Sequence, residues 1–241
     1  MKTPSHHSLA LFDTALRELR NSLLTMSSIA QRNLESAGRG LLDRNSTLCS
    51  LVIGEDDEVD ELERLIDREA MEILIRFSPL AQDLRVVLAS MRIASNLERV
   101  SDQAVTIARR ARKMNKQPEA ALCKTIEPVL QLSKELIRDA MKAFAEGSVQ
   151  LALTVIARDR ELDRRHRALT KEFTRAMEVQ PVDIRTYLHL TFIVRALERV
   201  GDHAVNIAED VVFIEQGEDI RHVHEAAENR RRAEVTTAPL N

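Results

Sequence analysis

Apolar residues recur at intervals of three and four positions along most of the chain. Near the N-terminus the series runs through Leu9, Phe12, Leu16, Leu19, Leu23 and Met26. This spacing places one apolar stripe on a helix face, whereas a half-buried strand would alternate apolar and polar positions. The pattern therefore predicts an all-α protein made of long amphipathic helices.

Breaks in this pattern predict six helices. Polar residues or prolines interrupt the apolar periodicity at 43–45, at 78–79 and at 115–118. The helices are expected at about residues 8–42, 46–77, 82–114, 119–146, 148–179 and 182–215. Because short connections make successive helices antiparallel neighbours, we expect two tandem, pseudo-symmetric three-helix bundles. The first would span residues 1–117 and the second 118–216, followed by a polar C-terminal tail at 217–241.

An internal repeat supports this division of the chain. The segment LERVSDQAVTIA at 97–108 returns as LERVGDHAVNIA at 197–208, with nine of twelve positions identical at an offset of 100. Further upstream, Asp56 and Asp60 correspond to Asp159 and Asp163 at an offset of 103. Self-similarity at a fixed period is the signature of a duplicated structural unit. We therefore expect two copies of one helical unit.

Each copy carries two acidic pairs spaced four residues apart. The pairs are Asp56/Asp60, Glu98/Asp102, Asp159/Asp163 and Glu198/Asp202. Carboxylates at this spacing share a helix face and repel each other by about 0.2–0.5 kcal/mol. Asp60 and Glu98 are each 19 residues from Pro79, so an antiparallel turn at the proline would place them at one level. Their rotation from the apolar stripes is also equal, so both pairs face the groove between the two helices or both face away from it.

Convergence of four carboxylates would require cations. Oxygen ligands without sulfur suit Mg, Mn, Ca or Fe and suit Zn less well, so each copy is predicted to hold divalent or multinuclear metal ions. The alternative is a solvated acidic surface with ion pairs to residues such as Arg99 and Arg199. A di-iron oxygenase would need Glu-x-x-His motifs, which His166, His189 and His203 do not form.

Composition excludes several classes of protein. The chain has 35 Lys and Arg against 38 Asp and Glu, and this balance argues against a broad nucleic-acid-binding surface. Its two cysteines form no CxxC motif, and no apolar run approaches the roughly 20 residues of a membrane span. The N-terminus lacks a signal-peptide core, so a cytoplasmic location is expected. Without a Gly-rich phosphate loop or a nucleophile motif, the chain is predicted to be a binding or regulatory protein and not an enzyme.

Several motifs resemble those of the PhoU family, bacterial accessory and regulatory proteins of phosphate transport. They are LERVSD, ALERVGDHAVNIAED, SPLAQDLR and GEDIRHV, and the resemblance extends from about residue 12 to 223. It implies two three-helix bundles with metal ions held by E(D)xxxD motifs at the eight acidic positions named above. Ser101 departs from the Gly that is usual in the motif, and Arg109 replaces the acid found at Glu209.

The resemblance also implies a function. A PhoU-like protein would be a non-catalytic adaptor that links the ATPase subunit of the phosphate ABC transporter to a membrane sensor histidine kinase. It would repress the phosphate-starvation response, form a homodimer and reach the inner face of the membrane through protein partners, without inserting into it. Two alternatives remain open: a metal-dependent phosphohydrolase that uses the same carboxylates, and a metal-independent helical scaffold.

Overall fold

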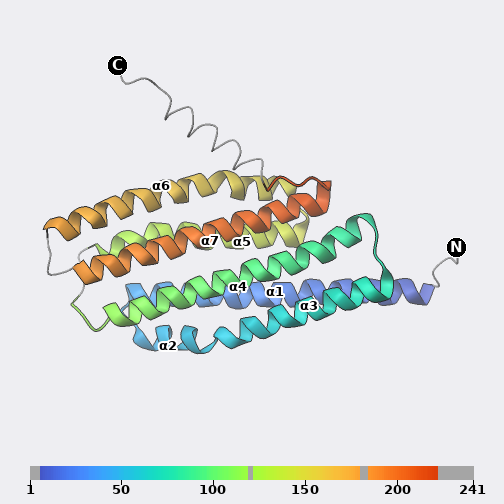
Figure 1. The fold of residues 1–241 in the computed structure, drawn as a ribbon, viewed down its shortest axis with the longest axis horizontal. Helices are drawn as coiled ribbons and strands as arrows, with labels where there is room; N and C mark the ends of the chain where they lie inside the picture. The colour runs from blue at the N-terminus through green and yellow to red at the C-terminus, as the bar shows by residue number, and fades with distance from the viewer. Residues whose placement is uncertain (1–5, 119–121, 180–183, 222–241) are drawn as a thin grey trace, which may run out of the picture.

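A computed structural model describes residues 6–118, 122–179 and 184–221, and nearly all of them are helical (Figure 1). The helices are α1 (His6–Leu42), α2 (Ser46–Gly54), α3 (Asp56–Phe77), α4 (Ala81–Met114), α5 (Glu127–Glu146), α6 (Val149–Val179) and α7 (Ile184–Gln216), with a short 3-10 helix, η1 (Cys123–Ile126). Within these ranges no strand occurs, which confirms the all-α prediction. None of the described helices combines the length and apolar character needed to cross a membrane.

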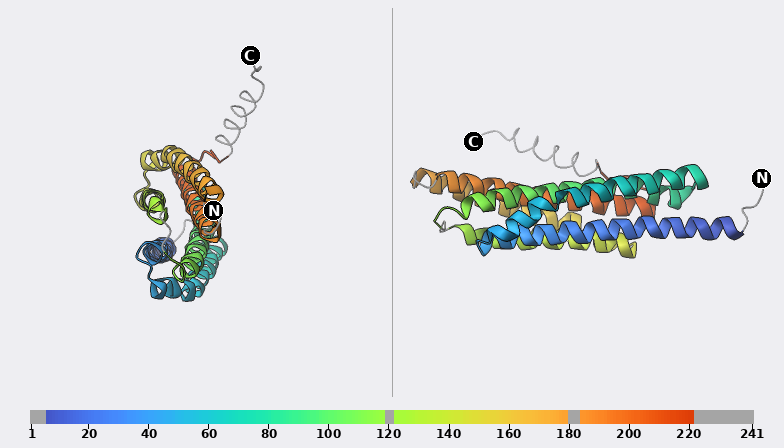
Figure 2. Two further views of the ribbon diagram at one scale, coloured as in Figure 1. Left: turned by 90° about the vertical axis from the view of Figure 1, so that its left-hand side faces the viewer. Right: turned by 90° about the horizontal axis from the view of Figure 1, so that it is seen from below.

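The helices form two bundles that lie side by side. Helices α1 to α4 pack together in one bundle and α5 to α7 in the other, as the end-on view in Figure 2 shows. The bundles meet through contacts of α4 with α7 and of α1 with α5. These are the first and third helices of each repeat, so the predicted pseudo-symmetric pair of three-helix bundles is confirmed.

The prediction of one continuous helix at 46–77 is wrong, because the structure has two helices there, α2 and α3. Glu55 separates the two segments with φ −93° and ψ 6°. Three acidic residues occupy the first turn of α3, where they interact favourably with the positive end of the helix dipole. Gly54 ends α2, and glycine is a poor residue for a helix interior. The acidic run therefore starts a helix as well as supplying carboxylates.

The connections agree with the predicted turns where they are described. Ser78 has a left-handed backbone with φ 47° and ends α3 directly before Pro79. The fourth helix begins only at Glu127, with Pro128 in its first turn, where a missing N–H is tolerated. Its predicted start at 119, the turn at Pro181 and the predicted tail beyond residue 221 lie outside the described residues.

A glycine permits the close contact between α1 and α5. A Cβ atom added to Gly38 would overlap with the side chain of Leu130, which is itself buried. Gly54 provides a contrast, because a Cβ atom there would meet nothing within 4 Å. Gly38 is therefore a packing requirement of the junction between the bundles.

Substitution of this glycine tests the junction. Gly38→Ala should lower the free energy of unfolding by roughly 1–3 kcal/mol, since an extra methyl group must displace Leu130 in a filled interior. The control Gly54→Ala should leave stability unchanged or raise it by about 0.5–1 kcal/mol through helix propensity. Urea unfolding followed by circular dichroism measures both, and equal effects of the two substitutions would contradict this account.

Candidate metal centres

The first set of predicted ligands comes together where α3 runs beside α4. Asp56 and Asp60 belong to α3, and Glu98 and Asp102 belong to α4. The charges of Asp60 and Asp102 act on the carboxyl of Glu98, and that of Asp102 also acts on Asp56. The two acidic pairs therefore face the groove between their helices, which decides between the two orientations that the sequence allowed. We call these four residues the α3–α4 acidic site.

Burial and mutual repulsion make the ionised form of this site unfavourable. Burial, aided by the negative charge of Asp102, raises the pKa of Glu98 to about 7, although Arg99 acts in the opposite direction. Burial also raises the pKa of Asp56, and Asp102 and Asp60 raise it further. Ionised carboxylates that are partly buried and repel one another would be stabilised by a nearby cation.

The second set converges in the same way between α6 and α7. A Cβ atom added to Gly201 would lie 2.6 Å from Oδ1 of Asp159, so Asp159 packs directly against the backbone of α7. The charge of Asp163 acts on both Glu198 and Asp202. Burial, followed by these like charges, raises the pKa of Asp202 to about 6 and raises that of Glu198. Asp159, Asp163, Glu198 and Asp202 are called the α6–α7 acidic site.

A hollow of about 550 Å³ opens at the α6–α7 acidic site. It is lined by His166, Thr170, Thr191, Arg195, Glu198, Arg199 and Asp202. His166 interacts electrostatically with Asp163 and Asp202, while burial is the main cause that lowers its pKa. The imidazole therefore shares the space of the predicted carboxylate ligands.

Arginines next to both sites provide part of the counter-charge. Equivalent pairs join Arg64 to Asp60 at 3.7 Å and Arg167 to Asp163 at 3.1 Å. Arg99 lies 3.3 Å from Glu98 and also contacts Asp102. These arginine side chains are largely exposed, and exposed ion pairs contribute at most about 1 kcal/mol. The ion pairs of the alternative interpretation thus occur, and the pKa values of Glu98 and Asp202 remain raised in their presence.

The carboxylates converge without forming a closed coordination shell. In the parts of the chain that are described, no group of three or more His, Cys, Asp and Glu side chains is arranged to hold a metal ion. The donor chemistry nevertheless fits a hard or borderline divalent cation, because each site gathers several carboxylates without a thiolate. Side-chain rotation would have to close the oxygen atoms around an ion.

Sequence reasoning missed two candidate site residues, Glu63 and His166. Each follows an expected ligand by three positions on the same helix face, Asp60 in one case and Asp163 in the other. The charge of Glu63 acts on Glu98, as that of His166 acts on Asp202. The signal was present in the sequence, because the two residues are related by the same offset of 103 as the aspartates.

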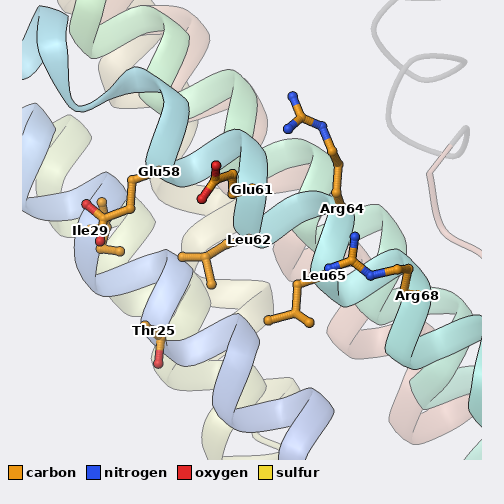
Figure 3. A pocket seen from close by; sticks show the side chains of 8 residues that line it. All are labelled: Thr25, Ile29, Glu58, Glu61, Leu62, Arg64, Leu65 and Arg68. Atoms are coloured by element: carbon orange, nitrogen blue, oxygen red, sulfur yellow. The ribbon is translucent and has the colours of Figure 1, made fainter.

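A separate hollow of about 560 Å³ lies between α1 and α3 (Figure 3). Ile29, Leu62 and Leu65 form its apolar lining, and Figure 3 shows both leucine side chains directed towards α1. Its acidic residues, Glu58 and Glu61, are exposed. None of the eight predicted ligands lines this hollow, so it is a groove between helices and not part of either acidic site.

The electrostatic cost of the α3–α4 acidic site can be measured in metal-free protein. Because the pKa of Glu98 rises from 4.5 to about 7, ionisation in this pH range lowers the stability of the folded state. Glu98→Gln should therefore be more stable than the parent protein by about 1–2 kcal/mol at pH 8 in EDTA. The difference should shrink as the pH falls from 7 and disappear below pH 4.5, where the parent carboxyl is protonated in both states.

Urea unfolding at several pH values provides this measurement. Glu61→Gln serves as the matched control, because Glu61 is an exposed acid of α3 that lies outside the site. An advantage of Glu98→Gln that did not change with pH would contradict the electrostatic explanation.

Comparison with known proteins relates both repeats to one family. The PhoU domain profile matches residues 23–111 and 126–211, one segment in each bundle. A phosphate-specific transport system accessory protein PhoU homolog from Pseudomonas aeruginosa is 33% identical over 233 residues, covering 94% of this chain and 96% of that protein. The homolog of the same name from Xylella fastidiosa strain Temecula1 is 32% identical and covers 93% of each chain.

Solved structures share the fold. The crystal structure of PhoU from Pseudomonas aeruginosa aligns with a TM-score of 0.84 at 32% identity, over 86% of this chain and 100% of that chain. The phosphate transport system regulatory protein PhoU from Streptococcus pneumoniae aligns with a TM-score of 0.80 at 26% identity, over 86% and 98%. These matches confirm the resemblance carried by the LERVSD and ALERVGDHAVNIAED motifs, and the chain belongs to the PhoU family.

Proposed function

We propose that this chain is a non-catalytic, metal-binding accessory protein of a phosphate transport system. The names of its relatives support the transport role, since they are accessory or regulatory proteins of such systems. The observation that carries the metal-binding role is the duplication of the acidic site. Each repeat has two acidic pairs on its second and third helices, and in both sites burial and like charge raise carboxyl pKa values.

The eight carboxylates named above would hold the ions, Mg, Mn or Fe in preference to Zn. A bound divalent ion would supply positive charge to each groove. The chain's own part is to keep Asp56 and Asp102, or Asp159 and Asp202, on facing helices of one bundle. The flanking arginines would then release the carboxylates and become available to other anionic groups.

The protein would act by binding one or the other of two partner proteins. We propose that it binds the ATPase subunit of the phosphate ABC transporter and a membrane sensor histidine kinase, as a cytoplasmic homodimer that reaches the inner face of the membrane through these proteins. Phosphate supply would shift the population between the two complexes and so repress the starvation response when phosphate is abundant. No chemical step is needed, which separates this role from that of a metal-dependent phosphohydrolase.

Metal binding should be lost one site at a time. Glu98→Gln with Asp102→Asn should abolish binding at the first site, Glu198→Gln with Asp202→Asn at the second, and the quadruple variant should bind neither ion. Calorimetry and elemental analysis with Mn²⁺ measure the stoichiometry, and Mn²⁺ at 100 times its Kd should stabilise the parent protein by about 2.7 kcal/mol per site.

Glu58→Gln with Glu61→Gln is the matched control, because it removes two acids of α3 that line the other hollow. Unchanged stoichiometry in the quadruple variant would show that the ligands lie elsewhere. If chelator-treated protein and metal-loaded protein bind partner proteins equally well, the metal-independent scaffold is favoured instead.

The regulatory role has its own test in the host bacterium. Deletion of the gene should leave phosphate-starvation genes expressed in phosphate-rich medium, because the link that reports phosphate sufficiency to the kinase is lost. A reporter fused to a starvation promoter measures this expression, and a plasmid copy of the gene should restore repression. Normal repression in the deletion strain would contradict the proposal, and phosphate release from model phosphoesters by purified, metal-loaded protein would favour the hydrolase.

A further inference from the structure

The outer face of α6 carries a line of positive charges that belongs to neither acidic site. Its members recur at intervals of three or four residues and are Arg160, Arg164, Arg167, Lys171 and Arg175. At 3.6 residues per turn, this spacing keeps them within about 80° of one another around the helix axis. All five are exposed, and the line from Arg160 to Arg175 is about 22 Å long. We call these five residues the α6 basic stripe.

The packing of α6 leaves this face free. The helix packs mainly on α5 and α7, and Figure 1 shows it along one edge of the double bundle. Its buried side chains lie on the side opposite the stripe and are Ala152, Val155, Leu162, Leu169 and Phe173. The stripe therefore points away from both bundles.

The charges of the stripe are largely unpaired, in contrast to another arginine of the same helix. Arg158 lies 2.6 Å from Glu135 and 3.0 Å from Asp139 of α5. Within the stripe, Arg167 is the one member with an ion pair to a described residue, Asp163 at 3.1 Å, and its side chain is 67% exposed. Like charges three or four residues apart on a helix repel each other. An external anionic group would relieve this repulsion.

The equivalent face of the first repeat is not basic. At the offset of 103, the five positions of the stripe correspond to Asp57, Glu61, Arg64, Arg68 and Glu72 of α3. These residues are exposed too, so the same helix face carries three acids and two arginines there. The uniform positive charge is therefore a property of the α6 edge and not of the repeated unit.

The stripe fits a negatively charged lipid surface better than a protein partner. Protein interfaces are centred on apolar or aromatic anchors, and their centres are depleted of charge. In α6, all of which is described, the exposed large apolar residues are Leu153 and Val179, and both lie beyond the ends of the stripe. Clusters of four to eight Lys and Arg on one helix are typical of sites that recognise anionic lipid headgroups. The overall balance of 35 basic and 38 acidic residues argues against a nucleic-acid surface.

We propose that the α6 basic stripe binds the anionic headgroups of a membrane surface, with α6 lying along the headgroups and not inserted among the acyl chains. The long side chains of Arg and Lys reach the lipid phosphates from a helix that stays packed on α5 and α7. This contact goes beyond the adaptor function. It adds a direct contact with lipid to the one that partner proteins would provide, and it requires neither those proteins nor a metal ion.

Sedimentation with lipid vesicles measures this contact in the full-length protein. Vesicles of equal parts phosphatidylglycerol and phosphatidylcholine should bind the protein, and vesicles of phosphatidylcholine alone should not. Because each basic residue near an anionic surface contributes about fivefold to the partition constant, neutralising four of them should weaken binding by at least about a hundredfold. The variant combines Arg160→Gln, Arg164→Gln, Lys171→Gln and Arg175→Gln. Raising the salt from about 0.1 M to about 1 M should also release the parent protein, since the Debye length falls from about 10 Å to about 3 Å.

Two further variants separate the position of the charge from its amount and its chemistry. The first removes the same net charge from exposed positions outside the stripe and should bind the vesicles as the parent does. It combines Arg20→Gln, Arg39→Gln, Arg68→Gln and Lys142→Gln. The second combines Arg160→Lys, Arg164→Lys and Arg175→Lys and should retain binding, because headgroup attraction depends on charge and not on the planar guanidinium. Glutamine and lysine are both good helix formers, so circular dichroism should show α6 intact in every variant.

Each contrary outcome identifies a different error. If the phosphatidylglycerol vesicles do not bind the parent protein, or bind the stripe variant equally well, the proposal is overturned and the adaptor function is unaffected. Loss of binding in the lysine variant would indicate arginine-specific recognition of a protein and overturn the assignment to lipid. Binding of duplex DNA through the stripe, without binding of vesicles, would overturn it in favour of a nucleic acid.

Discussion

Apolar packing forces like charges together in this protein, and the candidate sites depend on that constraint. Leu97 of α4 and Leu162 of α6 are fully buried, and Leu162 packs against the backbone of α7 at Gly201. The gain from burying such side chains is about 1.5–3 kcal/mol each, so the two together exceed the cost of about 1–2 kcal/mol of keeping Glu98 ionised in the groove. The bundle therefore tolerates carboxyls whose pKa values are raised.

Duplication makes the two sites comparable, and the comparison is informative because the copies are unequal. Gly201 lets Asp159 pack against the backbone of α7, whereas the first repeat has Ser101 at this place. The matched residues Glu63 and His166 also differ, because the first has a carboxyl group and the second an imidazole. The two copies therefore share a backbone arrangement but place different side chains beside their carboxylates.

Much of this organisation was predictable from local patterns. The helical period, the repeat and the equal distances from Pro79 predicted the fold and placed Asp60 and Glu98 at one level. The break at Glu55 was missed, because the apolar stripe continues across it and the acidic run was interpreted only as a set of ligands. His166 was set aside because it belongs to no Glu-x-x-His motif, although the offset of 103 pairs it with Glu63. Periodicity predicts each helix well, but it does not identify which side chains of two neighbouring helices face each other across a groove.

The sequence by itself determined the helices, their order and the presence of four acidic pairs, since these depend on spacing along the chain. The tertiary structure decided that both pairs in each repeat face their shared groove, because rotation relative to the apolar stripe allowed two orientations. It also decided which residues join them, since His166 and Asp202 are 36 positions apart and meet only through the packing of α6 on α7. The Coulomb energy of two charged side chains depends on their distance in space and not on their separation along the chain. Only the packing of the helices therefore determines which charged side chains interact.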